Sequence, residues 1–259
     1  GSENAIQIGK AISVLMNTRG EIGELIAGAL PPQRGVPLVA IPTDPAGDGA
    51  VSGALTLIDA LEGVKKTVTH DAFFPTASLF DPKMTLPLAT RYVAAWGLYI
   101  LSSAIEAFIS KTASPASDAL AVKAMELIAG NLRTSYQESD NLTAREGLMN
   151  AGLLSAMATA FSHPGSCRAL SHVLSSKSRI FQPVAEGVLL PHVMDFNLTA
   201  SPAKFVHIAR ALGEDVSDIS VVEAAIKAIE AVRKLLVDLR LPVRLSTLDV
   251  ENRALNDIS

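Results

Sequence analysis

The sequence predicts two unlike parts in one chain, a small α/β piece followed by a larger all-helical domain. Its 259 residues are enough for one large domain or two of ordinary size. Short β-branched apolar runs bounded by Gly and Pro occur only in the first eighty residues. After Asp81-Pro82 the apolar spacing becomes helical and remains so to the end. We therefore expect the α/β piece over residues 1–80 and the helical domain over residues 81–259.

The first part begins with helices and continues with short strands. Apolar spacing predicts a helix over residues 3–18 and a second over 21–29, which Pro31 and Pro32 end. The run VPLVAIP at 36–42 is apolar throughout, which predicts a buried strand. Further strands are predicted over residues 54–59, 65–69 and 77–80, the first two joined by a turn at Glu62-Gly63.

The second part is expected to contain eight helices. Their predicted ranges are 86–110, 117–136, 142–162, 166–177, 184–196, 202–212, 218–240 and 247–257. Ser117 and Ser201-Pro202 are candidate helix starts, and Thr143 with Glu146 has the spacing of a capping box.

The segment from Tyr92 to Ile109 raises the question of a membrane span, because Glu106 is its one formal charge. A helix that is apolar all round either crosses a membrane or forms the centre of a large core. Amphipathic helices follow it and can cover it. We therefore favour the buried core and expect no membrane association.

Composition excludes several classes of function. The net charge of −4, from 22 basic and 26 acidic residues, leaves no basic surface for nucleic acid. Cys167 is the single cysteine, so an intrachain disulfide and a cysteine zinc cluster are both excluded. One cysteine is typical of a reducing compartment, and the first twelve residues lack a signal-peptide pattern. We expect a cytoplasmic protein.

Four strings, in order, carry a resemblance to a known family. They are GSENAIQIGKAI at 1–12, AIPTDPAGDGA at 40–50, the Asp-Pro opening with its Ala-Ile-Glu-Ala helix at 81–111, and the stretch through Leu-Leu-Pro-His-Val-Met at 171–197. The chain resembles the iron-containing (group III) alcohol dehydrogenases, which include glycerol dehydrogenase-like enzymes and maleylacetate reductases, from about residue 1 to 240. The resemblance implies a partial Rossmann-like α/β domain over 1–80, a helical domain over 81–259, and an active site in the cleft between them.

The metal ligands that the resemblance implies are replaced. The family holds a divalent metal with one Asp and three His, and the matching positions here are Tyr99, Ser103, Arg168 and Gln182. None of these side chains is a carboxylate or imidazole, and Arg168 brings a fixed positive charge. We expect neither iron nor zinc in this protein.

Two residues remain candidates for catalysis. His172 stands where the family has a histidine near substrate and nicotinamide, so it is either a surviving proton relay or a half-buried helix histidine. We favour the second interpretation, because a general base needs a polarised substrate beside it. Arg168 could polarise a carbonyl or hold a substrate carboxylate.

The nucleotide site implied by the resemblance is altered too. Gly1, Ser2 and Asn4 lie in the loop where the family has a glycine-rich phosphate site, but Glu3 lies among them and would repel a diphosphate. A second candidate group of cofactor-binding residues lies in the following string and consists of Thr43, Asp44 and Gly47. Asp44 and Asp48 add negative charge there. We expect no tightly bound cofactor, with NAD(P) the nucleotide that the resemblance suggests.

Two hypotheses for function follow. The chain is either a divergent, metal-free member with lost or altered catalysis, acting as a pseudo-subunit or binding partner, or an NAD(P)-dependent, metal-independent reductase of a small anionic carbonyl compound, similar to maleylacetate reductase. We favour the first. The family places further strands before the first string, so we also expect an incomplete sheet that a second copy or another chain completes.

Overall fold

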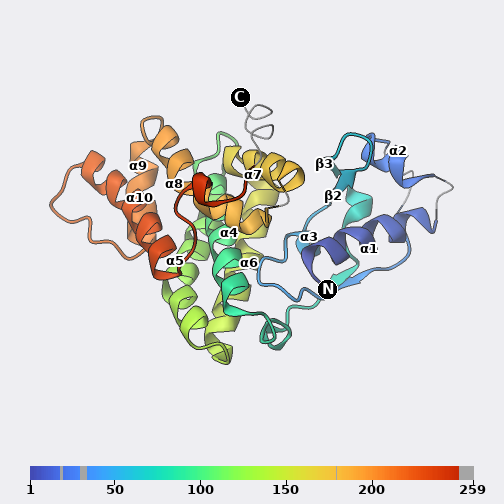
Figure 1. The fold of residues 1–259 in the computed structure, drawn as a ribbon, viewed down its shortest axis with the longest axis horizontal. Helices are drawn as coiled ribbons and strands as arrows, with labels where there is room; N and C mark the ends of the chain where they lie inside the picture. The colour runs from blue at the N-terminus through green and yellow to red at the C-terminus, as the bar shows by residue number, and fades with distance from the viewer. Residues whose placement is uncertain (18–19, 30–33, 179, 251–259) are drawn as a thin grey trace.

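A computed structural model describes residues 1–17, 20–29, 34–178 and 180–250. It has the predicted fold class, with a small α/β part at one end and a helical bundle at the other (Figure 1). The α/β part contains α1 (Glu3–Leu15), α2 (Ile22–Ile26), β1 (Val39–Ala40), α3 (Asp48–Val51), β2 (Ala54–Asp59), β3 (Val64–Thr69), η1 (Asp71–Phe73), β4 (Ala77–Ser78) and η2 (Pro82–Thr85).

The hairpin of β2 and β3 confirms the strand pair predicted around Glu62-Gly63. The strands are antiparallel, with Ala54 opposite Thr69 and Asp59 opposite Val64. Gly63 takes a φ of +66°, a conformation that costs glycine least. α1 packs on this hairpin and buries Ala11 and Val14 against Leu55.

The prediction of a buried strand over 36–42 was wrong. Only Val39–Ala40 form a strand, and the Val39 side chain is 59% exposed. β1 pairs in parallel with β4 alone, and no other described strand lies on its second edge. Pro42 lacks the N–H group that would extend the ladder with β4 beyond Ala40.

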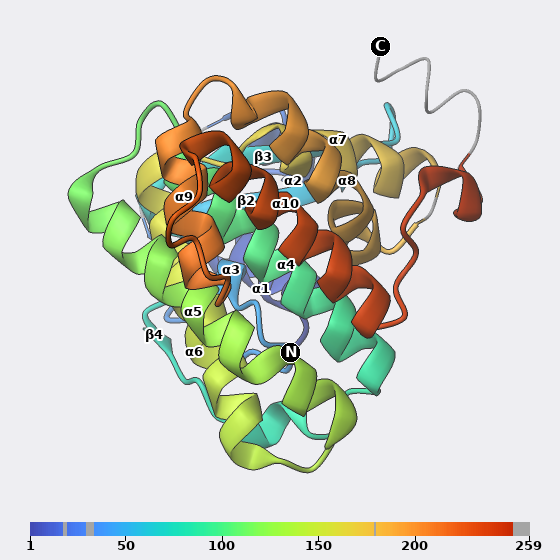
Figure 2. The same cartoon turned by 90° about the vertical axis from the view of Figure 1, so that its left-hand side faces the viewer.

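The bundle is built around α4 (Thr90–Ile109), which Figure 2 shows enclosed by the other helices. Gly97 of α4 packs against Leu132, and the Ser155 hydroxyl donates 3.0 Å to the Ile100 carbonyl. In the most apolar stretch of α4, 89% of the residues are buried inside the protein. The surrounding helices are α5 (Pro115–Gln137), α6 (Leu142–Ser162), α7 (Ser166–Lys177), α8 (Gln182–Leu198), α9 (Pro202–Ala211) and α10 (Val221–Asp238), followed by η3 (Leu245–Thr247).

Most helix ranges agree with the prediction, but the predicted caps of α5 and α6 were wrong. α6 is capped by Asn141, whose side chain accepts from the Ala144 N–H at 3.0 Å, so Thr143 lies inside the first turn. α5 starts at Pro115, two residues before the predicted Ser117, and its N-cap Ser114 forms a capping box with Ser117. The helix predicted over 247–257 is absent at 248–250, and residues 251–259 lie outside the described part.

The two parts meet along the loop that joins β1 to α3. A side chain at Gly152 of α6 would place its Cβ 1.7 Å from the carbonyl oxygen of Pro45, so the loop lies directly on that helix. This packing brings Asp48, at the start of α3, next to α4 and α7. The side chains that meet there form the candidate site.

Candidate functional site

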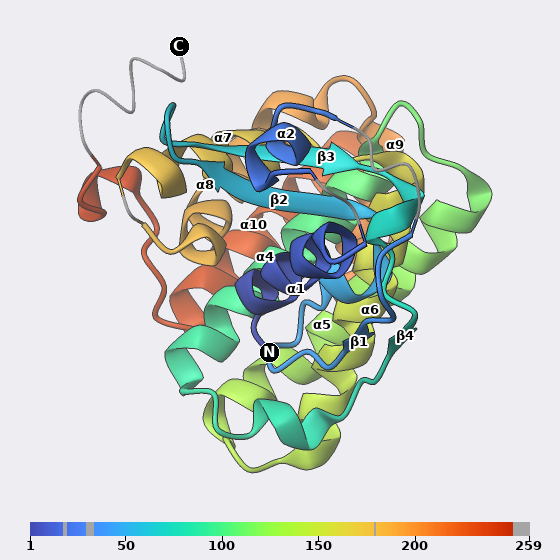
Figure 3. The same cartoon turned by 90° about the vertical axis from the view of Figure 1, so that its right-hand side faces the viewer.

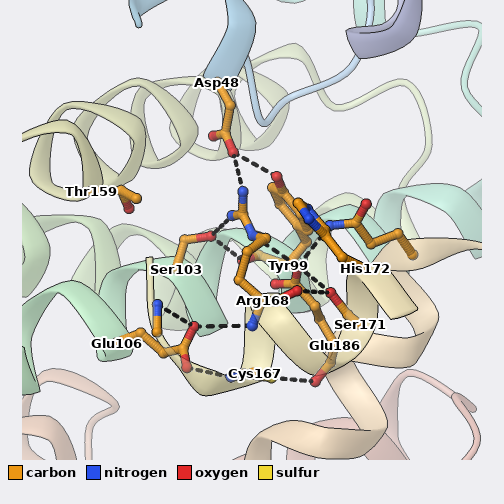
Figure 4. A network of polar contacts seen from close by, with 12 residues as sticks. Asp48, Tyr99, Ser103, Glu106, Thr159, Cys167, Arg168, Ser171, His172 and Glu186 are labelled. Atoms are coloured by element: carbon orange, nitrogen blue, oxygen red, sulfur yellow. Dashed lines mark hydrogen bonds and ion pairs between the residues drawn. The ribbon is translucent and has the colours of Figure 1, made fainter. Parts of the chain in front are cut away.

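Arg168, in the first turn of α7, is the centre of a buried polar cluster (Figure 4). Its Nη1 lies 3.1 Å from Asp48 Oδ2, and its Nε lies 2.9 Å from Glu186 Oε1 without hydrogen-bond alignment. Its Nη2 donates to the hydroxyl of Ser103. The side chain is 13% exposed and that of Glu186 is fully buried. We call Asp48, Tyr99, Ser103, Arg168, Gln182 and Glu186 the Arg168 cluster.

Tyr99 of α4 lies against the guanidinium. The Arg168 Cζ is 4.2 Å from the centre of the Tyr99 ring, within cation–π distance, and the Tyr99 hydroxyl donates 2.6 Å to Asp48 Oδ2. Burial raises the pKa of Tyr99 well above its usual value, so the hydroxyl keeps its proton. Burial alone would lower the pKa of Arg168, but Glu186, Tyr99 and Asp48 outweigh it and raise that pKa above its already high value.

Gln182, at the start of α8, joins the cluster through Glu186. Its Nε2 donates 3.0 Å to Glu186 Oε1, which also accepts from the Ser171 hydroxyl at 3.0 Å. Lys65 of β3 donates to Gln182 Oε1 at 2.5 Å, which is a further contact between the two parts of the chain. The structure therefore brings together all four positions that the resemblance assigned to metal ligands.

Glu106 fixes the start of α7 and thereby the position of Arg168. Its carboxylate accepts from the backbone N–H groups of Gly165, Cys167 and Arg168, at 3.2, 2.6 and 3.3 Å. A side chain at Gly165 would meet this carboxylate at 2.5 Å, so the close approach requires glycine. Burial raises the pKa of Glu106 to about 7, while the bond from Cys167 opposes the shift.

The two reactive side chains beside Arg168 are held in unreactive forms. Burial, Arg168 and Lys65 lower the pKa of His172 to about 3, so the half-buried imidazole is neutral at physiological pH. Cys167 is fully buried, and burial raises the pKa of its thiol well above the usual value. A thiol in this state is a poor nucleophile.

The Arg168 cluster does not fit a divalent metal. The described residues contain no group of three or more His, Cys, Asp or Glu that could hold one. The side chains at the four positions assigned to metal ligands are a protonated phenol, a hydroxyl, an amide and a guanidinium cation. A guanidinium bound by two carboxylates already supplies the positive charge that a metal would bring.

The N-terminus of α1 faces the loop after β1, and carboxylates of the chain itself occupy it. Asp44 Oδ2 accepts from the Glu3 N–H at 3.0 Å, and Glu3 Oε2 accepts from the Gly49 N–H at 2.9 Å. Burial raises the pKa of Glu3 to about 7 and that of Asp44 to about 6, and nearby Asp48 adds to both shifts. These residues do not fit a diphosphate, because the anion would meet carboxylates where it needs free N–H groups.

The other predicted cofactor residues lie around the same helix start. Ser2 is the N-cap of α1 without a side-chain cap, Asn4 is exposed, and Thr43 donates its N–H to the Gly1 carbonyl at 3.0 Å. Gly47 takes a φ of +63° before α3 and approaches Phe80 too closely for a side chain. Their location agrees with the predicted loop, while their role in binding stays a prediction.

Sequence reasoning missed Glu186 and Lys65 as members of the site and gave Asp48 no partner. One signal could have found Glu186, because a single carboxylate in the apolar stretch VAEGVLL needs a buried counter-charge. It also lies four residues after Gln182, hence on the same helix face. Lys65 is in an ordinary alternating strand and carries no comparable signal.

Two family models match the chain. One, described as "Fe-containing alcohol dehydrogenase family, C-terminal", covers residues 93–259, and another, described as "Iron-containing alcohol dehydrogenase", covers residues 1–82. The chain belongs to the iron-containing alcohol dehydrogenase family. The resemblance stated from the sequence is thereby confirmed.

The relatives of the chain are longer than it is. The 1,3-propanediol dehydrogenase of Klebsiella pneumoniae is 35% identical over 248 residues, which make up 94% of this chain and 63% of that protein. The NAD-dependent methanol dehydrogenase of Bacillus methanolicus is 32% identical over 235 residues, which are 90% of this chain and 61% of its own. The chain thus spans less than two thirds of the length of these relatives.

Solved structures confirm the fold. A 1,3-propanediol oxidoreductase superposes with a TM-score of 0.93 and 33% identity, covering 98% of this chain and 66% of its own. The sulfoacetaldehyde reductase of Bifidobacterium kashiwanohense, solved in complex with NAD+, superposes with a TM-score of 0.88 and 26% identity, covering 100% of this chain and 67% of its own. A maleylacetate reductase from Rhizobium shares the fold at 20% identity, with a TM-score of 0.80 over 100% of this chain and 64% of its own.

Proposed function

We propose that this chain is a metal-independent member of the iron-containing alcohol dehydrogenase family, that it has lost the dehydrogenase reaction, and that it acts by binding, as a non-catalytic subunit or partner. The observation that carries the proposal is the guanidinium of Arg168, which lies among the four positions that the resemblance assigned to metal ligands. A cytoplasmic location fits the single, buried cysteine.

The charges of the Arg168 cluster support a structural role for the cation. Asp48 and Glu186 face the guanidinium, Ser103 accepts from its Nη2, and the Tyr99 ring covers one side. Little of the guanidinium remains to polarise a substrate carbonyl or bind a substrate carboxylate. The metal-independent reductase is therefore the less supported of the two hypotheses.

Proton transfer has little support in the same place. A general acid or base works best with a pKa near the operating pH, and that of His172 is about 3. The Tyr99 hydroxyl is held in the protonated form and already donates to Asp48. Neither group can exchange a proton readily at neutral pH.

The nucleotide part of the site supports the same conclusion. The Glu3 and Gly49 N–H groups are each bound by a carboxylate of the chain. A dinucleotide would have to displace Asp44 and Glu3 and then tolerate them nearby. We infer that NAD(P) binding is weak, although the relatives include NAD-dependent enzymes.

Metal binding by a back-substituted variant tests the proposal. The variant Tyr99→Asp, Ser103→His, Arg168→His, Gln182→His restores one carboxylate and three imidazoles. Calorimetry with Zn²⁺ should show one site per chain in this variant and none in the wild-type protein. A matched control keeps Arg168 and carries the other three substitutions, and it should not bind Zn²⁺.

Two results would contradict the proposal. Stoichiometric Zn²⁺ binding by the wild-type chain would show that the Arg168 cluster accepts a metal. Failure of the folded four-site variant to bind Zn²⁺ would show that these positions do not form the family's metal site. Circular dichroism of each variant establishes that the bundle has folded.

A further inference from the structure

The α/β part and the helical bundle meet along a boundary to which both the β2–β3 hairpin and the loop before α3 contribute. In the view of Figure 3, α1 and the hairpin lie in front of the bundle, and β3 contacts α7. Ala46, in the loop before α3, belongs to the core of the bundle. Two parts of a chain are expected to move relative to one another unless a strong interface holds them. The contacts that cross this boundary therefore decide whether the two parts move as one body.

One bridge across the boundary runs through Asp48, at the start of α3. Its Oδ2 accepts from Arg168 Nη1 of α7 at 3.1 Å and from the Tyr99 hydroxyl of α4 at 2.6 Å (Figure 4). A single carboxylate oxygen of the α/β part thus binds two helices of the bundle. The side chains of Asp48 and Arg168 are only 19% and 13% exposed, and a charged hydrogen bond with so little solvent around it is strengthened.

Another bridge runs through Lys65 of β3. Its Nζ donates to Oε1 of Gln182, the first residue of α8, at 2.5 Å. Lys66, the next residue of the strand, pairs instead with Asp59 and Glu62 of the hairpin itself. Successive side chains of a strand point to opposite faces, so of these two lysines only Lys65 reaches the bundle.

Both bridges end at the carboxylate of Glu186, which is fully buried. Its Oε1 lies 2.9 Å from Arg168 Nε and accepts from Gln182 Nε2 at 3.0 Å. The chain of contacts that starts at Asp48 and the chain that starts at Lys65 therefore meet in one oxygen atom. A displacement of the α/β part that stretches one chain also pulls on the atom that holds the other.

Within the α/β part, the starting points of the two bridges are joined as well. Glu3 of α1 accepts from the Gly49 N–H at 2.9 Å and from Gln7 Nε2 at 2.6 Å. Gln7 Oε1 in turn accepts from the Thr56 N–H of β2 at 2.9 Å. The start of α3 is in this way fastened to the hairpin that carries Lys65.

We propose that the Arg168 cluster, together with Lys65, is a lock that holds the α/β part and the bundle as one rigid body. The lock keeps closed the cleft in which the resemblance places the active site. Arg168 is central to it, because Asp48 and Glu186 come from different parts of the chain and would repel each other without the cation between them. The inference concerns motion between the two parts and does not depend on whether a reaction survives at Arg168.

The distance between two spin labels, one in each part, tests the proposal. Leu61 in the β2–β3 turn is 97% exposed and Phe196 near the end of α8 is 81% exposed, so both can be replaced by cysteine and labelled, whereas Cys167 is fully buried. Pulsed electron paramagnetic resonance of the otherwise unchanged chain should give one narrow distance distribution. The double variant Asp48→Ala, Lys65→Met should lose it, and each single variant, which keeps one bridge, should give an intermediate width.

Lys66 provides the matched control, because its partners lie within the hairpin. The double variant Asp48→Ala, Lys66→Met should give the same distribution as Asp48→Ala alone. Circular dichroism shows that each variant has folded. Asp48→Asn, which keeps the shape of the side chain and removes its charge, takes the place of Asp48→Ala if the latter does not fold, and it should broaden the distribution in the same direction.

Three results would overturn the proposal: a broad distribution in the otherwise unchanged chain, a narrow one in folded Asp48→Ala, Lys65→Met, or equal broadening when Lys66→Met replaces Lys65→Met. The second result would mean that packing of the loop on α6 is enough to hold the two parts together. The titration with Zn²⁺ that tests the proposed function is a separate measurement, so failure of one proposal is distinguishable from failure of the other.

Discussion

Replacing Arg168 by methionine should destabilise the protein by about 3 kcal/mol. The substitution leaves Glu186, which is fully buried, and Asp48, whose side chain is 19% exposed, without their counter-charge. Removing one partner of a buried ion pair costs about 3–5 kcal/mol. We take the lower end, because Asp48 keeps the Tyr99 hydroxyl and Glu186 keeps its bonds from Gln182 and Ser171.

Urea unfolding, followed by circular dichroism and by the fluorescence of Trp96, measures the effect. Trp96 is the single tryptophan, and its ring lies 5.1 Å from that of Tyr99, so its emission reports on the cluster. Adding Asp48→Asn and Glu186→Gln to Arg168→Met should recover at least half of the lost free energy, because it removes the unpaired charges.

A matched exposed pair provides the control. Arg133 and Asp238 lie 2.8 Å apart with side chains 40% and 35% exposed, so Arg133→Met should cost less than about 1 kcal/mol. A loss of stability in Arg168→Met as small as that in Arg133→Met, or a triple variant less stable than Arg168→Met alone, would contradict this prediction.

Three further predictions follow from the same contacts. The pKa of Glu106 is raised to about 7 in the folded protein. The stability that its protonated form contributes is therefore fully present below about pH 4.5 and is lost as pH rises through 7. The decline in melting temperature from pH 5 to 8 should be shallower in Glu106→Gln, and an unchanged slope would contradict this prediction. Calorimetry with NAD+ and NADP+ should show no micromolar binding by the wild-type chain. The double variant Glu3→Gly, Asp44→Thr should bind these nucleotides more tightly than the wild-type chain does. Equal binding by both proteins would mean that these carboxylates do not exclude the nucleotide. Gly152→Ala should lower the melting temperature, because the new Cβ would lie 1.7 Å from the Pro45 carbonyl oxygen. The control Gly130→Ala, in open space on α5, should raise the free energy of unfolding by about 1 kcal/mol. A change of the same sign in both variants would contradict the close approach at Gly152.

The helical domain was largely predictable from the sequence, because its apolar spacing is regular and its breaks are marked by Pro, Gly and capping residues. α6 and α7 begin and end where the spacing placed them. The caps were harder to place, since Ser, Thr and Asn occur at neighbouring positions and only packing decides among them. Asn141 rather than Thr143 caps α6 for this reason.

The prediction of a buried strand over 36–42 was wrong for a different reason. An apolar run indicates that both faces of a strand prefer burial, but it does not indicate that the rest of the sheet is present. Among the described strands β1 pairs only with β4, and Val39 is 59% exposed.

The candidate site was predictable in its positions but not in its contacts. The resemblance placed Tyr99, Ser103, Arg168 and Gln182 together, and the structure brings them together. The counter-charges come from Asp48 and Glu186, which lie 120 residues before and 18 residues after Arg168. Spacing cannot pair side chains across two parts of a chain; tertiary packing does.

We propose that Arg168 takes the place of the family's divalent cation. Elemental analysis tests this proposal, on protein made in medium supplemented with iron and zinc and then dialysed without chelator. We expect far less than one equivalent of either metal per chain. One equivalent of iron or zinc per chain, retained by the wild-type protein and lost in a variant at Tyr99, Ser103 or Gln182, would contradict it.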